Sequence, residues 1–290
     1  MTNPGIIDAL DAPPREGPVA VPRRRGRRAA RWVDRAAVGV LAAYVLVGVV
    51  GPFLVEKPSG LHADYLVGPS AAHWFGTDDL GQDVFAQVVW GSRISITVGV
   101  AASVIAITIG VALGLVGAYF RRAESPVLGA TDVMLSLPHL PLMIFVTALA
   151  GGSVATLTLV IGLLSWAEVT RLIRSRALEV AKMPYIDGAR AIGTGGLRII
   201  LTEILPAIRP VIVVSVLLTA ARAVIAEAGL SYLGLGDPTM WSWGRILLNA
   251  QRAGVVSTAW WLSVFPSLAI LGLVLAATIV GSRASDGRAT

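Results

Sequence analysis

Residues 94–120 read ISITVGVAASVIAITIGVALGLVGAYF and contain no charged side chain. A helix rises about 1.5 Å per residue, so about 20 apolar residues cross the ~30 Å hydrocarbon core of a bilayer. This stretch is long enough to do so. Apolar stretches of comparable character occupy residues 36–55, 133–150, 154–173, 207–230 and 260–280. The sequence therefore predicts an all-α membrane protein with six transmembrane helices.

The composition agrees with a membrane environment and excludes other classes of protein. Of the 290 residues, 55% are hydrophobic and 14% are charged, and the mean hydropathy is +0.72; soluble domains carry about a quarter charged residues. A soluble enzyme and a disordered chain are thus excluded. The chain has no cysteine, which excludes a disulfide framework, a thiolate metal site and a cysteine nucleophile. The spacing of His62, His73 and His139 does not form a metal-ligand cluster.

The distribution of the basic residues predicts the topology. The chain carries 24 basic and 18 acidic residues, a net charge of +6. Most basic residues precede residue 36, form the pair Arg121–Arg122, lie between residues 171 and 209 or follow residue 282. The remaining loops contain only Lys57, Arg93, Arg245 and Arg252. Because positively charged loops stay in the cytoplasm, we expect both termini there. No basic face is left over for nucleic acid.

Ionisable residues inside the predicted spans are functional candidates, because a charge in the hydrocarbon core is costly unless it is paired or solvated. We expect Asp132 and Glu168 to lie near the cytoplasmic ends of their helices as interfacial carboxylates. Arg222 and Glu227 lie deeper in the fifth span, about 140° apart around the helix, which argues against a mutual pair. Each either lines a pore or forms a structural ion pair with another span.

A long connection precedes the fifth span. Residues 177–206 read ALEVAKMPYIDGARAIGTGGLRIILTEILP, more than a turn between two spans needs. Pro184 and the glycines from Gly193 onward are breakers, so we expect a short helix over residues 185–192. A second apolar turn is expected to end at Pro206.

The residues of this short helix suit contact with another protein. Gly188, Ala189 and Ala191 have little side-chain bulk and allow close approach, while Asp187 and Arg190 can orient polar contacts. No G-x-x-x-x-G-K-[ST] loop is present. If ATP drives this protein, a partner must bind it.

An external loop before the second span contains HWFGTDDLGQD at residues 73–83. Thr77 and Asp78 are residue types that cap helices. We therefore expect one of them to cap a short helix that leads into the second span.

The connection resembles the cytoplasmic coupling motif of binding-protein-dependent ABC importer permeases, written E-A-A, three residues, G, nine residues, I, one residue, L-P. Asp187-Gly188-Ala189 stands at the E-A-A, Gly193 at the G and Leu205-Pro206 at the end. Residues 74–83, residues 227–236 and Ser242-Trp243-Gly244 add to the likeness. Together they resemble the C-type permease subunit of dipeptide, oligopeptide and nickel importers, with departures at Asp187-Gly188, Glu203 and Gln82.

The resemblance implies a type I ABC importer permease fold and covers roughly residues 30–281. We divide the chain into a disordered basic tail (1–35), the first transmembrane helix with its external loop (36–91), a type-1 permease domain (92–281) and a cytoplasmic tail (282–290).

The resemblance also implies partners. They are a sister permease forming a heterodimeric pore, two cytoplasmic ATPases that bind ATP and Mg²⁺, and an external substrate-binding protein, all at a bacterial plasma membrane. This chain would bind no cofactor or metal and would not be an enzyme. The expected ATPase-coupling residues are Tyr185, Asp187, Gly188, Ala189, Arg190, Ala191, Gly193, Leu205 and Pro206. The expected external loop or gate residues are Thr77, Asp78, Asp83 and Trp243.

Peptides are the first substrate class that the resemblance implies, with nickel or another metal chelate as the alternative. An ion-coupled secondary transporter is a rival from another class, but the spans contain few carboxylates for a proton relay. An intramembrane enzyme would need paired carboxylates or a metal-ligand motif inside a span. ATP dependence of uptake would separate the importer from both.

Overall fold

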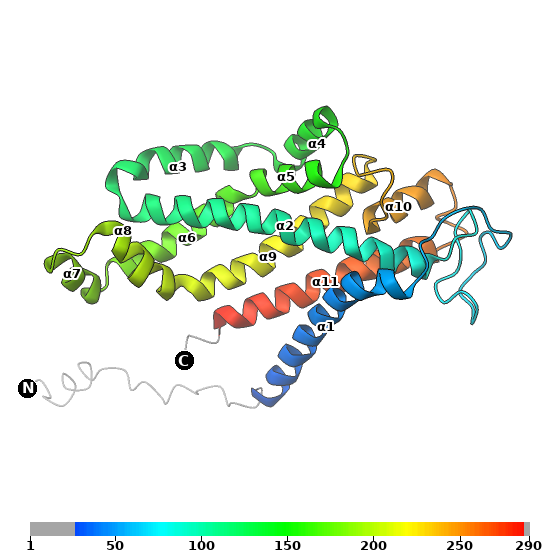
Figure 1. The fold of residues 1–290 in the computed structure, drawn as a ribbon, viewed down its shortest axis with the longest axis horizontal. Coiled ribbons are helices and arrows are strands. Elements are labelled where there is room, and N and C mark those ends of the chain that lie inside the picture. The colour runs from blue at the N-terminus through cyan, green and yellow to red at the C-terminus, as the bar shows by residue number, and fades with distance from the viewer. Residues whose placement is uncertain (1–26, 287–290) are drawn as a thin grey trace, which may run out of the picture. The chain divides into compact units, whose positions relative to one another are not determined.

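A computed structural model describes the backbone of residues 27–286 and the side chains of residues 35–282 (Figure 1). The chain forms two compact units, residues 1–33 and residues 34–290. Of the first unit only helical backbone from Arg27 is described. The elements are α1 (Arg27–Leu54), α2 (Val84–Tyr119), α3 (Arg121–Ser136), α4 (His139–Ala150), α5 (Val154–Leu164), α6 (Trp166–Ala181), α7 (Pro184–Ala191), α8 (Gly196–Ile199), the π-helical turn η2 (Ile200–Ile204), α9 (Leu205–Tyr232), α10 (Trp243–Arg252) and α11 (Trp261–Asp286).

Five helices of the described chain are long and apolar enough to span a membrane, and a sixth span results if α3 and α4 count as one. The all-α prediction with six spans is confirmed in this sense. The third predicted span, residues 133–150, is wrong as a straight helix, because α3 and α4 meet at 86°. Leu137 precedes Pro138 and has extended backbone (φ −80°, ψ 139°), the conformation that a following proline favours.

Helix α2 packs against α5, α6 and α9 within residues 34–290, and Figure 1 shows it running beside α9 and α6. Glycines on α2 allow the close approach. A Cβ atom on Gly110 would lie 2.5 Å from Val169 of α6, and one on Gly114 would lie 2.9 Å from Ile173. This G-x-x-x-G spacing is a known means of bringing membrane helices together, and it was readable in the sequence.

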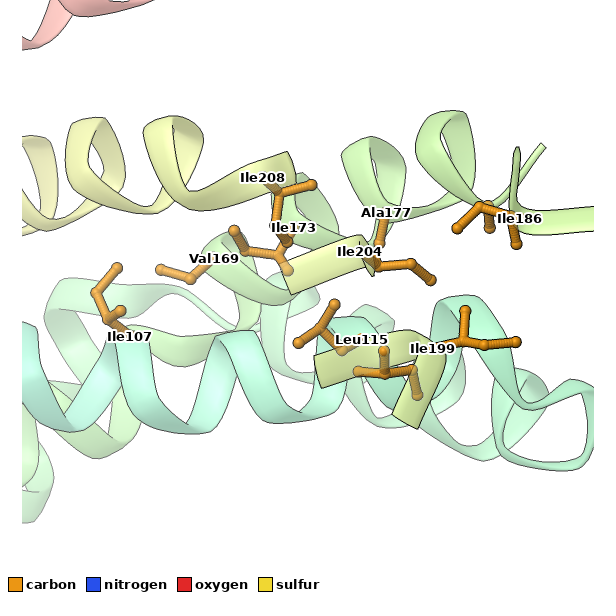
Figure 2. Packing of buried hydrophobic residues seen from close by; sticks show 11 residues of the cluster. Ile107, Leu115, Val169, Ile173, Ala177, Ile186, Ile199, Ile204 and Ile208 are labelled. Carbon is orange, nitrogen blue, oxygen red and sulfur yellow. The ribbon is translucent and has the colours of Figure 1, made fainter. Parts of the chain in front are cut away.

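A buried aliphatic cluster joins α2, α6, α7 and the start of the fifth span (Figure 2). Its labelled members are Ile107, Leu115, Val169, Ile173, Ala177, Ile186, Ile199, Ile204 and Ile208. Ile186 is the only buried residue of α7 and is fully covered. The short helix is therefore anchored to a densely packed core chiefly by Ile186, with Ala189 packed against the same cluster.

The expectation that an apolar turn ends at Pro206 is wrong, because the chain stays helical from Gly196 to Tyr232. Pro206 lies in the first turn of α9 and follows the π-helical turn η2. The N–H of Leu205 bonds to the carbonyl of Ile200, five residues back. This wider turn lets the helix pass a residue that has no N–H.

In the external loop, the expected short helix capped by Thr77 or Asp78 is also wrong. Asp83 is the N-cap of α2 and its Oδ1 accepts a hydrogen bond from the N–H of Ala86 at 3.1 Å. Thr77 forms an isolated β-bridge with Asp83, so no short helix precedes α2. The second span therefore begins at Val84, earlier than residue 94.

Helix α1 begins at Arg27, so Arg27, Arg28, Arg31 and Arg35 are helical and do not belong to a tail. Residues 1–26 of the predicted basic tail lie outside the described residues, as do residues 287–290 at the other end. Helix α11 continues past residue 282 to Asp286. The division into four segments otherwise stays a prediction.

Candidate functional site

Helix α7 is built by a proline and a glycine at its two ends. Pro184 occupies the first turn, where a missing N–H costs nothing. At the other end the N–H of Gly193 bonds to the carbonyl of Arg190, and the N–H of Thr194 to that of Ala189, both at 3.0 Å. This is a Schellman motif, and Gly193 has the positive φ of 79° that it requires. Gly193, which stands at the G of the coupling pattern, therefore has the structural role of ending α7.

The outward surface of α7 is free of other parts of the described chain. Tyr185 is half-exposed, and Ile192 is 83% exposed. Asp187 accepts a hydrogen bond from the guanidinium of Arg190 at 2.9 Å, and Arg190 also lies over the ring of Tyr119, 5.3 Å from its centre. A side chain added at Gly188 would meet nothing within 4 Å. An aromatic ring, an ion pair and open space therefore lie together on a rigid helix.

The remaining predicted coupling residues lie around this helix. Ala191 is exposed, whereas Ala189 is partly buried against the aliphatic cluster. Leu205 packs against the same cluster and Pro206 is partly buried at the start of α9. Motif residues from two helices thus share one core.

A second candidate site is a cavity of about 310 Å³ deeper in the bundle. It lies where two helix interruptions meet: His139 begins α4 after the bend at Pro138, and Ser165 separates α5 from α6. Discontinuous membrane helices commonly form binding sites. The lining residues are His139, Leu140, Met143, Ile161, Ser165, Glu168, Thr219, Arg222, Ile225 and Ala226.

The charges of the cavity belong to one ion pair. Nη1 of Arg222 in α9 donates to Oε2 of Glu168 in α6. Their side chains remain 57% and 46% exposed in this chain. The sequence left two alternatives for Arg222, pore lining or an ion pair with another span. In the structure Arg222 both lines a cavity and pairs with α6. Asp132 is exposed and pairs with Arg171 at 2.5 Å.

Glu227 is separated from Arg222, as the sequence predicts, and does not line this cavity. Its side chain is fully buried and accepts hydrogen bonds from the hydroxyls of Ser95 at 2.7 Å and Ser231 at 2.6 Å. Ser95 also accepts a bond from the N–H of Trp243. Glu227 thus joins α2, α9 and α10 inside the bundle.

The predicted external loop residues hold the loop together. Thr77 is buried, accepts from the N–H of Val67 and donates to the carbonyl of Asp64. Asp78 accepts from the N–H groups of Leu80 and Gln82.

Trp243 is fully buried and donates from its indole to the carbonyl of Val88 at 3.0 Å. Asp83 caps α2 and contacts His73 at 3.0 Å. A gate role for these four residues stays a prediction; these contacts join them to the loop and to α2.

Burial raises the pKa of the Asp78 carboxyl above its usual value, against the hydrogen bonds that lower it.

Two residues of the cavity had no functional role in the sequence analysis. Thr219 is an ordinary helical threonine by sequence. For His139 the sequence favours a structural or interfacial role over metal binding. Nε2 of His139 and Oγ1 of Thr219 are buried without a hydrogen-bond partner among the described residues. Only the tertiary structure places them beside Arg222. Within the same residues, no three His, Cys, Asp or Glu side chains gather as a metal site.

Comparison with known proteins gives consistent similarities. The family described as "Binding-protein-dependent transport system inner membrane component" matches residues 106–285. The dipeptide transport system permease protein DppC of Bacillus subtilis is 33% identical over 253 residues, which cover 85% of this chain and 78% of that protein. The glutathione transport system permease protein GsiD of Pectobacterium atrosepticum is 34% identical over 221 residues, covering 76% and 73%.

A solved structure shares the fold at low sequence identity. It is that of the MetNI methionine ABC transporter in an inward-facing conformation, with a TM-score of 0.59 and 16% identity, covering 70% of this chain and 96% of the other. The type I importer permease fold predicted from the sequence is confirmed.

Proposed function

Because the chain belongs to the family of binding-protein-dependent transport system inner membrane components, we propose that it conducts peptides and that an ATPase moves it through α7. The chain is a multi-pass permease subunit of an ATP-driven importer in the bacterial plasma membrane. Separate ATPase subunits hydrolyse the ATP. The peptide substrate, the residues that couple and the remaining partners are the proposal.

The attachment of α7 to the core carries the coupling proposal. Ile186 is fully buried in the cluster that contains residues of α6 and of the start of the fifth span. A force on α7 therefore reaches α6, which carries Glu168 in its first turn, and α9, which carries Arg222 in its interior. Tightly packed cores transmit displacement because they have no free volume to absorb it.

The exposed residues around α7 give the ATPase its contact surface. Tyr185 and the Asp187–Arg190 pair provide aromatic and polar contacts. Gly188, Ala189 and Ala191 permit close approach, and Gly193 ends the helix sharply. Leu205 and Pro206 support the helix from α9. The basic residues between positions 171 and 209 support a cytoplasmic location for α7.

The substrate and the other partners follow from the relatives. Relatives at 33% and 34% identity are named for dipeptide and glutathione transport, and glutathione is itself a small peptide. We therefore assign short peptides to this chain. A sister permease would complete the pore, two ATPases would bind ATP and Mg²⁺, and an external binding protein would deliver the peptide.

Bulky substitutions on α7 test the coupling role. Gly188→Trp and Ala191→Trp fill the space that the ATPase would occupy without disturbing the core, because both positions are exposed. We expect ATP-driven dipeptide uptake by proteoliposomes of the assembled importer to fall at least about tenfold. The matched control is Gly129→Trp on α3, where an added side chain also meets nothing within 4 Å. Unchanged uptake by both α7 variants would contradict the coupling role.

A further inference from the structure

The cavity around Arg222 is not explained by coupling to an ATPase. It is lined by residues from α4, α5, α6 and α9, on both sides of two helix interruptions. Arg222 lies ten residues before the end of α9 at Tyr232, a distance of about 15 Å along the helix. The cavity is thus near the middle of a ~30 Å hydrocarbon core.

Two threonines in the described helices, Thr147 and Thr219, have buried hydroxyls without a hydrogen-bond partner, and of the two only Thr219 lines the cavity. Thr158 and Thr170 donate their hydroxyls to the carbonyls of Val154 and Trp166, four residues back. Thr219 is 3% exposed and lines the cavity, but its hydroxyl has no such partner. A buried hydroxyl without a hydrogen bond is unfavourable. The group therefore needs a partner from outside the described chain.

His139 of α4 presents a similar unpaired group to the same cavity. It is the first residue of α4, directly after the bend. Its Nε2 is buried and has no partner among the described residues. An imidazole nitrogen can donate or accept a hydrogen bond, depending on the tautomer.

The ion pair of the cavity leaves most of its bonding capacity unused. Arg222 and Glu168 share one hydrogen bond, whereas a guanidinium has five N–H donors and a carboxylate accepts several bonds. Both side chains line the cavity and remain about half-exposed in this chain. A charged pair at this depth is expensive unless further polar groups reach it.

We propose that this cavity is the chain's share of an intramembrane binding site for a zwitterionic short peptide, with Arg222 binding the peptide carboxylate and Glu168 its ammonium group. Thr219 and His139 supply hydrogen bonds that neither has within the chain. The apolar walls, among them Leu140, Met143 and Ile225, accept side chains of varied shape. The inference rests on the proposed function and specifies the substrate chemistry.

The depth of the site separates a peptide from a lipid headgroup of the same charge pattern. Zwitterionic headgroups lie at the bilayer surface, whereas Arg222 lies about 15 Å below the end of α9. A transported solute must pass this depth. A peptide is therefore the favoured occupant.

A charge swap tests the assignment against a purely structural ion pair. Arg222→Gln should raise the KM for dialanine uptake by the assembled importer about tenfold, since a hydrogen bond to a charged group is lost. The double variant Arg222→Glu with Glu168→Arg restores an ion pair but reverses its direction. We expect the double variant to be more thermally stable in detergent than Arg222→Gln, but to have the same raised KM. Recovery of both by the double variant would overturn the proposal.

Arg171 and Asp132 provide the matched control. They form an exposed ion pair between α6 and α3 that does not line the cavity. The same swap at these positions should leave the KM for dialanine unchanged. A rise equal to that of the Arg222 variants would show that charge reversal alone disturbs transport, and would overturn the assignment.

Removal of a hydroxyl gives a second test that a structural role would not pass. Thr219→Val deletes an unpaired polar group, so a structural role predicts equal or greater stability and unchanged uptake. We expect equal stability with a severalfold rise in KM for dialanine. Thr170→Val is the control, because Thr170 is also buried but has a carbonyl partner. Unchanged KM in Thr219→Val would count against a ligand at this hydroxyl.

Cysteine labelling tests occupancy without reference to ATP. The chain has no cysteine, so Ile225→Cys introduces a single thiol at the cavity, and Val213→Cys a comparably exposed thiol on α9 outside it. In the full importer in nanodiscs, a water-soluble maleimide should label Ile225→Cys faster, and dialanine should slow only that reaction. An unreactive Ile225→Cys would mean that the sister subunit or lipid fills the cavity. A reaction that dialanine does not slow would mean that no peptide binds there; either result overturns the proposal.

Failure of the proposed function would look different. In that case the unsubstituted importer would show no ATP-driven dialanine uptake, whatever the result of labelling. Protection of Ile225→Cys with failed uptake would retain the binding site and reject the transport role. Dialanine uptake without protection of Ile225→Cys would retain the transport role and reject the binding site.

Discussion

Two charges on α9, five positions apart, have opposite surroundings. Glu227 is fully buried and each of its carboxylate oxygens accepts a serine hydroxyl. Arg222 is more than half exposed, pairs once with Glu168 and adjoins two polar groups without partners. A buried carboxyl group whose hydrogen bonds are made holds helices together, whereas polar groups without partners are available to a ligand. The same helix therefore combines a structural centre and a candidate ligand site.

Removal of Glu227 should produce the largest loss of stability. Glu227→Ala leaves two serine hydroxyls without their acceptor and creates a cavity between α2, α9 and α10. We expect the free energy of unfolding to fall by about 2–4 kcal/mol, measured by denaturation in mixed micelles. Arg222→Ala should cost less, because its side chain is half-exposed. An equal loss from both variants would contradict the comparison.

A glycine substitution tests the packing of α2 against α6, the helix that carries Glu168. Gly110→Ala places a Cβ atom 2.5 Å from Val169, next to Glu168 on α6. We expect a loss of about 1–3 kcal/mol in unfolding free energy, because α2 and α6 must separate. The control Gly129→Ala has open space around it and should change stability little. Equal stability of both variants would show that α2–α6 packing yields easily.

Two hydroxyl deletions on α9 sharpen the comparison directly. Ser231→Ala removes a donor to the buried Glu227, so we expect it to lower the unfolding free energy by about 1 kcal/mol. Thr219→Val removes a hydroxyl without a partner and should cost nothing. The two variants would be compared in one denaturation series. A greater loss from Thr219→Val would mean that its hydroxyl is already bonded within the chain.

The smallest expected effect concerns pH and the external loop. Burial raises the pKa of Asp78 above its usual value, so the neutral form is favoured in the folded loop. The contribution of this group to loop stability is complete below the ordinary pKa of 3.8 and is lost as the pH rises through the raised value. Amide protection factors of Leu80 and Gln82 should therefore decrease slightly from acid to neutral pH.

Substitution isolates this carboxyl from the others in the loop. Asp78→Asn should remove most of the pH dependence of these protection factors. Asp64→Asn is the control, because Asp64 is exposed and contributes only its backbone carbonyl to Thr77. If Asp64→Asn removes the dependence as well, the titration does not come from Asp78.

Several features could be predicted from the sequence because they depend on local chemistry. Apolar stretches of spanning length predicted the helices, and Pro184 and Gly193 predicted the ends of α7, since each residue acts on its own turn. The motif around Asp187 and Gly193 indicated the family. The capping prediction for Thr77 and Asp78 was wrong, because several residue types can cap a helix and only the surrounding bonds select Asp83.

What remained undecided by sequence depended on contacts between distant residues. The 3.6-residue period predicted that Arg222 and Glu227 would not pair, but it could not choose their partners. The fold brings Glu168 to Arg222 and Ser95 to Glu227 across 54 and 132 positions of sequence. The cavity likewise exists only because the interruptions at Pro138 and Ser165 meet. Sequence alone determined most of the membrane-spanning segments, because apolar length is a local property, whereas tertiary packing decided where helices bend, which polar side chains are buried and which remain open to a ligand.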